Sequence, residues 1–136
     1  MAGFAGYTMA NELLNFFYRG QAITIPATLY LRLLVEPSSR NGGGTETNYS
    51  GYSRLALPRG TTIFSAASNG QLTNSAILAF GAAASAGNGN LIAFDIVDTI
   101  SGSFTKVYNG GPISPEKAII VGKVPKFRAG ALIVTF

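Results

Sequence analysis

The sequence predicts an all-β domain, a sandwich or barrel of about eight strands, with one short helix near its N-terminus. Short runs with strand-like alternation of apolar and polar residues follow one another from residue 28 to residue 136. Turn residues rich in Gly, Asn and Pro separate these runs. No helical segments alternate with the strands, which argues against an α/β fold. The 136 residues are enough for one domain, which buries about two thirds of its unfolded surface.

The first seven residues, MAGFAGY, are predicted to form an N-terminal arm (residues 1–7) outside the domain. The segment is rich in glycine and uncharged, and Phe4 and Tyr7 are its aromatic residues. It has too little apolar surface to fold alone, so we expect disorder in the free protein and order against a partner. Residues 8–136 are predicted to form a single β-sandwich domain that begins with a helix over residues 8–19.

The helix prediction depends on signals at both of its ends. Thr8 can cap the N-terminus, and Gly20 can close the C-terminus. An apolar stripe along one face of the helix is expected to pack against or across the end of a sheet. This stripe consists of Ala10, Leu13, Leu14 and Phe17. Met9, Phe16 and Tyr18 lie away from the stripe, where they either face a partner or belong to a broader core-facing stripe.

The centre of the predicted sheet is a pair of strand-like runs, residues 28–36 and 52–57, held apart by a long polar loop. Leucines alternate with other residues in both runs, so each strand turns a leucine row inward and a second row outward. Tyrosine and arginine dominate the outward row, and both residue types are enriched in protein interfaces. We therefore expect contacts with another protein from Tyr30, Arg32, Tyr52 and Arg54.

Seven further strands are predicted between turn signals. They cover residues 61–65, 75–80, 91–98, 105–108, 118–121, 124–127 and 131–136. The sequence NGGP at residues 109–112 is interpreted as a turn. The strand at 91–98 is apolar on both faces, which indicates that it is covered on both sides. Asp95 lies within it and is expected to pair with an arginine or to cap a neighbouring loop.

The chain lacks the residues that several kinds of catalytic and metal sites require. It contains no cysteine and no histidine, which excludes disulfides, catalytic triads with these residues and the usual zinc sites. Asp95 and Asp98 are the best candidate acid pair, but residues three apart in a strand point to opposite faces. The glycines at 42–44 lack the Lys-Ser/Thr pair of a phosphate-binding loop, and those at 87–89 precede a strand rather than a helix. We expect no enzymatic activity, no cofactor and no metal site.

The charge content predicts a subunit of a permanent assembly. Charged residues make up 12% of the chain, about half of the usual share, which leaves much apolar surface to be covered by a partner. The net charge is +4, and the basic residues are scattered except for Lys123, Lys126 and Arg128. The sequence shows neither a signal-peptide pattern nor an apolar run near twenty residues. We therefore expect neither a nucleic-acid nor a membrane partner.

Several segments, in their order and spacing, resemble a family of small virion proteins of tailed bacteriophages. The segments are LLNFFYRGQAITIPATLYLRLLVEPSSRNGGGTETNYSGYSRLAL, SNGQLTNSAILAF, GNGNLIAFDIVD, NGGPIS and FRAGALIVTF. Members of the family are often labelled tail-fibre proteins, and the family is similar to jelly-roll cement proteins that decorate capsid shells. The resemblance covers nearly the whole chain and implies a jelly-roll-like β-sandwich.

The resemblance implies a structural virion protein, first of all a capsid cement (decoration) protein on the outside of the shell. Such a protein stabilises contacts between major capsid proteins, and it is made in the cytoplasm of the host bacterium. The expected partners are the major capsid protein and copies of the chain itself, as a homo-dimer or trimer. The alternatives are a tail-fibre or baseplate component and a glycan-binding module, although the chain has no tryptophan. The expected partner-binding residues are Phe4, Tyr7, Phe16, Tyr18, Tyr30, Arg32, Tyr52 and Arg54.

Overall fold

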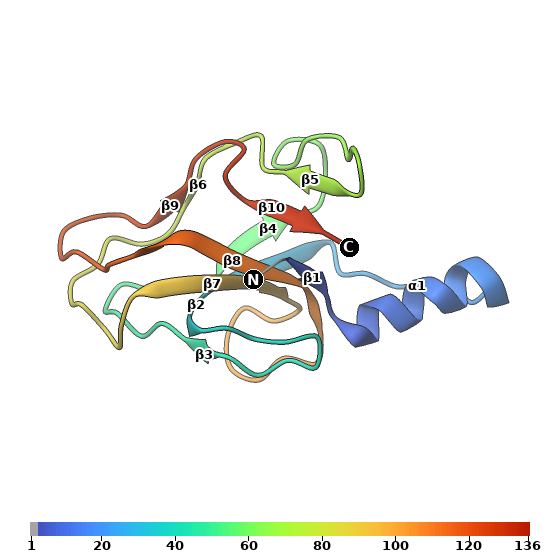
Figure 1. Cartoon of the computed structure of the whole chain (residues 1–136), viewed down its shortest axis with the longest axis horizontal. Coiled ribbons are helices and arrows are strands. Elements are labelled where there is room, and N and C mark those ends of the chain that lie inside the picture. The colour runs from blue at the N-terminus through green and yellow to red at the C-terminus, as the bar shows by residue number, and fades with distance from the viewer. Residues whose placement is uncertain (1–2) are drawn as a thin grey trace.

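The computed structural model describes residues 3–136 and contains ten strands and one helix (Figure 1). The elements are β1 (Phe4–Ala5), α1 (Tyr7–Arg19), β2 (Thr28–Glu36), β3 (Thr45–Glu46), β4 (Leu55–Pro58), β5 (Gln71–Thr73), β6 (Leu78–Ala79), β7 (Leu91–Val97), β8 (Val107–Lys117), β9 (Lys126–Phe127) and β10 (Ile133–Thr135). The predicted class, an all-β sandwich with one short N-terminal helix, is confirmed.

The largest sheet has six antiparallel strands. Its order is β1-β8-β7-β2-β3, and β4 also pairs with β2. The first half of β2 pairs with β4, with Leu31 opposite Leu55, and the second half pairs with β3, with Leu34 opposite Glu46. Strands β3 and β4 therefore share one edge of β2, while β7 occupies the other edge. Two separate two-stranded ladders, β5–β10 and β6–β9, complete the β structure of the described residues.

The core lies between the large sheet and the two ladders. One cluster of buried residues joins Leu31 and Leu33 of β2 and Phe94 of β7 to Phe127 of β9 and to Leu132, which precedes β10. Burying a leucine or phenylalanine side chain contributes about 1.5–3 kcal/mol, so these contacts hold the two layers together. Alternation along β2 places Leu31 and Leu33 in this cluster, as the sequence predicted.

The predicted turn at residues 109–112 is wrong, because these residues lie inside the longest strand, β8. Gly110 and Gly111 are not in the left-handed region of φ that a tight turn requires. Instead, a Cβ atom at Gly110 would lie 2.5 Å from the Phe4 ring, and one at Gly111 would lie 3.1 Å from the Phe94 ring. The glycines therefore make room for aromatic rings against the strand. The strand predicted at 118–121 is also wrong, since these residues belong to the loop between β8 and β9.

Part of the predicted N-terminal arm lies against β8 in this structure. Phe4 and Ala5 form β1 and pair with Gly110 and Asn109 of β8. The backbone N–H of Gly6 donates to the carbonyl of Tyr108 at 2.8 Å, and the boundary between the arm and the domain stays a prediction. The first two residues of the predicted arm lie outside the described residues.

Helix α1 projects away from the β body (Figure 1). It begins at Tyr7, with Gly6 in an extended conformation as its N-cap, and Thr8 makes no capping hydrogen bond. Gly20 ends it in the left-handed conformation, with φ of 66° and a hydrogen bond from its N–H to the carbonyl of Asn15, as predicted. No helix among residues 3–136 is both long and apolar enough to cross a bilayer.

Candidate protein-interaction surface

The first turn of α1 is fixed to the β body by backbone and arginine contacts. The N–H of Tyr7 donates to the carbonyl of Arg40 at 2.8 Å, and Arg40 Nε donates to the carbonyl of Ala5 at 2.8 Å. The Arg40 guanidinium also lies 4.2 Å from the centroid of the Tyr7 ring, within the range of a cation–π contact. The direction in which the helix leaves the body is therefore set at its N-terminal end.

An ion pair between Glu12 and Lys106 fixes the middle of the helix to the segment just before β8. The hydrogen bond to Glu12 raises the pKa of Lys106, against a smaller lowering by partial burial. Both side chains are partly exposed, so this pair contributes about 0–1 kcal/mol to stability and acts mainly on orientation.

The C-terminal half of α1 exposes large apolar side chains. Leu14 is 56% exposed, Phe17 71% and Tyr18 84%, and Tyr7 and Phe16 are also exposed. The predicted packing of the Leu14 and Phe17 stripe on a sheet is therefore wrong. Within the described residues, no residue of α1 is buried, and Met9 is the helix residue that packs against the core cluster. We call the set Tyr7, Leu14, Phe16, Phe17 and Tyr18 the helix surface.

A cavity of about 460 Å³ lies beside the helix surface. Leu13, Leu14 and Phe17 line it from the helix, and Phe4 and the exposed Phe136 line it from the β body. The walls are almost wholly apolar, with Arg40 as the charged residue among them. An exposed apolar face next to an apolar cavity is typical of a protein-interaction site.

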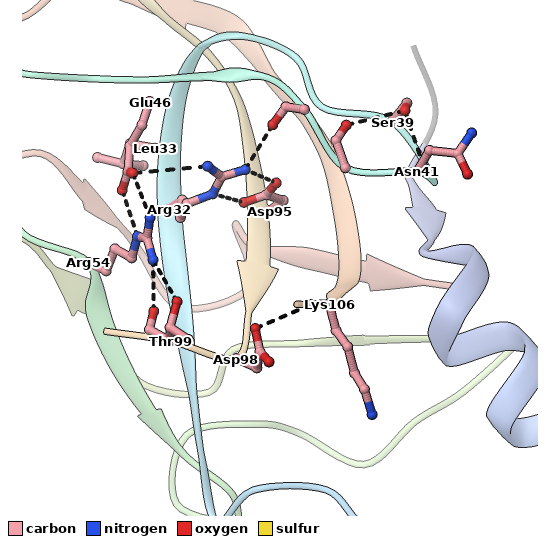
Figure 2. A network of polar contacts seen from close by, with 12 residues as sticks. Arg32, Leu33, Ser39, Asn41, Glu46, Arg54, Asp95, Asp98, Thr99 and Lys106 are labelled. Atoms are coloured by element: carbon pink, nitrogen blue, oxygen red, sulfur yellow. Dashed lines mark hydrogen bonds and ion pairs between the residues drawn. The ribbon is translucent and has the colours of Figure 1, made fainter. Parts of the chain in front are cut away.

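The predicted outward row of tyrosines and arginines is placed differently, because both arginines are buried (Figure 2). Arg32 on β2 holds Asp95 on β7 in a bidentate ion pair, with Nε to Oδ1 at 2.7 Å and Nη2 to Oδ2 at 2.6 Å. Its Nη2 also donates to the carbonyl of Gly43 at 3.2 Å, and Phe104 lies 4.3 Å from its guanidinium carbon. The expected pairing of Asp95 with an arginine is confirmed.

Arg54 and the half-buried Glu46 extend this network, since the Glu46 carboxylate also lies 4.0 Å from Nη1 of Arg32 (Figure 2). The Nε and Nη2 of Arg54 donate to the two carboxylate oxygens of Glu46 at 3.0 Å, and Nη1 donates to Thr99 at 3.0 Å. Tyr52 donates its hydroxyl to the same carboxylate. Burial acts to raise the pKa of Glu46, but the hydrogen bonds from Arg54 and Tyr52 and the nearby positive charges lower it below its usual value.

The interpretation of this row as one outward surface is therefore wrong for Arg32 and Arg54. Alternation shows that they share a face, but the loops that carry Gly43 and Thr99 cover that face as well. Tyr52 is half-buried, with its ring stacked on Phe80. Tyr30 is half-buried on β2, where its contact with a partner stays a prediction.

Four predicted partner-binding residues lie at or beside α1. Tyr7, Phe16 and Tyr18 belong to the helix surface, and half-buried Phe4 lines the adjacent cavity. Leu14 and Phe17 were missed as partner-facing residues, because their spacing is also that of a core-facing stripe.

The two acidic residues that were weighed as a catalytic pair are each held separately. Asp95 is fully buried against Arg32. Asp98 accepts hydrogen bonds from the hydroxyl and N–H of Thr105 and from the N–H of Lys106. Burial acts to raise the pKa of Asp98, but these hydrogen bonds lower it overall. Among residues 3–136 no group of three or more acidic side chains is arranged to hold a metal ion.

The chain is thus an antiparallel β-sandwich with a projecting helix that exposes large apolar side chains. A family model described as "Podophage GP4 fiber I protein gp80" matches residues 4–135, and the chain belongs to this family. The resemblance to tailed-phage virion proteins is thereby confirmed. No curated protein matches the chain.

Proposed function

We propose that this chain is a non-enzymatic structural subunit of a tailed-phage particle that docks onto a neighbouring virion protein through the helix surface. The observation that carries this proposal is the exposure of Leu14, Phe17 and Tyr18 on a helix whose base is fixed. A free apolar helix laid into a groove is a recurring mode of protein recognition. Pre-setting its direction lowers the entropic cost of binding.

The position of this subunit in the particle has two candidates. The family description favours a fibre component attached to the tail. The low charge content and the exposed apolar helix equally support a cement protein on the capsid exterior that bridges major capsid subunits. In either position, we propose assembly as a dimer or trimer, because several linked helices bind with higher avidity than one.

Copy number distinguishes the two positions. Purified particles are separated on a gel, and the band of this chain is quantified against that of the major capsid protein. A cement protein is expected near parity with the capsid protein, whereas a fibre component is expected at a small fraction of it.

The docking role is tested with the double variant Leu14→Asp/Phe17→Asp. Both side chains are exposed, so we expect the melting temperature to stay within about 3 °C of the parent and incorporation into particles to fall about tenfold or more. Thr8→Asp/Asn11→Asp is the matched control, because it adds the same charge at exposed polar positions of the same helix. Undiminished incorporation of the Leu14/Phe17 variant would refute docking through this surface.

A further inference from the structure

A second and larger cavity shares Gly3 with the cavity beside the helix, but no residue of the helix surface lines it, and the docking proposal does not involve it. Its volume is about 790 Å³. It is lined by the second half of β8, the loop between β8 and β9, and residues of β9 and β10. Strand β9 and this loop lie at the end of the β body opposite the projecting helix (Figure 1). The volume is in the range of pockets that hold a ligand or a short peptide segment.

Four basic residues line this cavity. They are Lys117, Lys123, Lys126 and Arg128, and all four side chains are exposed. None of them has an ion pair or side-chain hydrogen bond within the described residues. The lining contains no acidic residue, so it carries four positive charges that no carboxylate of the lining balances.

None of the acidic residues of the chain lines this cavity. Glu12, Glu46 and Asp95 are paired with basic residues, as described above. Glu116 is the nearest carboxylate along the chain, but it is not part of the lining and accepts a hydrogen bond from Asn90 at 3.2 Å. A second copy of the chain would bring the same positive charge and few free carboxylates, so it is a poor occupant. The occupant has to supply the negative charge itself.

The apolar part of the lining indicates what else the occupant carries. Ile120, Val124 and Ile133 are exposed aliphatic side chains in the lining. The aromatic rings there, Phe94 and Phe127, are buried, so no exposed ring is available to stack on a base, as single-stranded nucleic acids require. Aliphatic side chains next to lysines and an arginine match a segment in which apolar and acidic residues occur together.

We propose that this cavity binds an acidic, aliphatic-rich segment of another protein chain. The lysines and Arg128 pair with its carboxylates, and Ile120, Val124 and Ile133 cover its apolar side chains. Complementary charge of this kind increases the rate of association and selects against basic partners. The site is separate from the helix surface, so the proposal holds whether the subunit belongs to the fibre or to the shell.

The test measures the binding of fluorescein-labelled synthetic peptides to the full chain by fluorescence anisotropy. The probe is the peptide Asp-Leu-Glu-Val-Asp-Leu-Glu-Val. Two matched peptides replace either its acidic residues by Asn and Gln or its aliphatic residues by Ser. We expect the probe to bind. Each replacement should weaken binding about tenfold or more, because it removes several contacts and a tenfold change in Kd corresponds to about 1.4 kcal/mol of binding free energy. Added salt should weaken binding of the probe further.

Two variants with the same change of net charge separate this site from general electrostatics. Lys123→Glu/Lys126→Glu should weaken probe binding about tenfold, whereas Arg19→Glu/Arg59→Glu, with both changes outside the cavity, should stay within about threefold of the parent. Ile120→Ser tests the aliphatic contact at an exposed position and should weaken binding several-fold. The docking variant Leu14→Asp/Phe17→Asp should bind the probe like the parent, so this test and that of the helix surface fail independently.

Three outcomes would overturn the proposal. The first is no binding of the probe up to about 1 mM, which corresponds to less than about 4 kcal/mol of binding free energy. The second is equal binding of the serine-substituted peptide, which would mean that charge alone is recognised. The third is that heparin or oligo-dT binds more tightly than the probe and that Lys123→Glu/Lys126→Glu weakens this binding about tenfold as well. That result would assign the cavity to a polyanion.

Discussion

The buried ion pair between Arg32 and Asp95 makes a strong prediction about stability. Asp95→Asn keeps the shape of the side chain and removes its charge, which leaves the buried Arg32 guanidinium without its close counter-charge and with the more distant Glu46 carboxylate at 4.0 Å. Two short charge-assisted hydrogen bonds, at 2.7 and 2.6 Å, join the two residues across neighbouring strands. Breaking a buried pair from one side costs about 3–5 kcal/mol, so we expect Asp95→Asn to lose that much unfolding free energy.

The measurement is urea denaturation followed by circular dichroism, with melting temperature as a second readout. For a chain of this length the loss corresponds to a decrease of about 10–20 °C in melting temperature. Glu36→Gln is the control, since Glu36 is an exposed carboxylate that accepts a hydrogen bond from Thr45 at 3.0 Å. We expect this change to cost about 0.5 kcal/mol or less.

A charge-free double variant separates the cost of an unpaired charge from the contribution of the pair itself. Arg32→Met/Asp95→Leu removes both charges and keeps apolar volume, so its stability should return to within about 1 kcal/mol of the parent. If Asp95→Asn costs less than about 1 kcal/mol, or if the double variant is no more stable than the single one, the reasoning from the buried charge is wrong.

Three further predictions follow from other contacts. Gly6→Ala should cost about 1–3 kcal/mol in urea denaturation, because its Cβ would lie 1.8 Å from the backbone carbonyl oxygen of Val107. Acidification should lower the urea midpoint, because the pKa values of Glu46 and Asp98 are lowered in the folded protein. The stability that these residues contribute is fully present above their ordinary pKa values of 4.5 and 3.8, and it is lost as pH falls through their lowered folded pKa values. Glu46→Gln should therefore reduce the pH dependence of the urea midpoint. Lys106→Met should speed hydrogen exchange in α1 while costing about 1 kcal/mol or less, and unchanged exchange would mean that the ion pair does not orient the helix.

The pattern of apolar residues and turn residues predicted the two central strands, β2 and β7, because their bounds depend on nearby residues. The run at 28–36 has the bounds of β2, and the run at 91–98 extends one residue beyond β7. In both, strict alternation or a run of apolar residues lies between turn residues. Asp95 could be assigned a basic partner from sequence because a carboxylate inside an apolar strand has to be compensated.

Long-range contacts decided what could not be predicted. The sequence NGGP has the composition of a turn, but in β8 the aromatic rings of Phe4 and Phe94 occupy the space that the glycines leave. These rings come from distant segments, so no local signal reveals them. The same limit applies to Arg32 and Arg54, since alternation places them on one face and only the loops packed over that face show that it is covered.

For α1, the apolar stripe predicted which residues share one face of the helix. It did not predict whether the β body or another protein covers that face. Leu14 and Phe17 have the spacing of core residues and are exposed in the described structure. The low charge content is the sequence feature that agrees with this exposure, because it also indicates surface that a partner covers.

The distribution of charge links the stability of the domain to both proposed binding surfaces. Three carboxylates pair with basic residues inside the β body or at the middle of α1, where they hold strands and helix together. This pairing leaves the helix surface apolar at one end and an excess of positive charge around the larger cavity at the other end. The two surfaces share no residue and differ in chemistry, so the two proposals together predict that a single copy binds two unlike partners at once. On these proposals, the subunit links an apolar groove on one virion protein to an acidic segment on another.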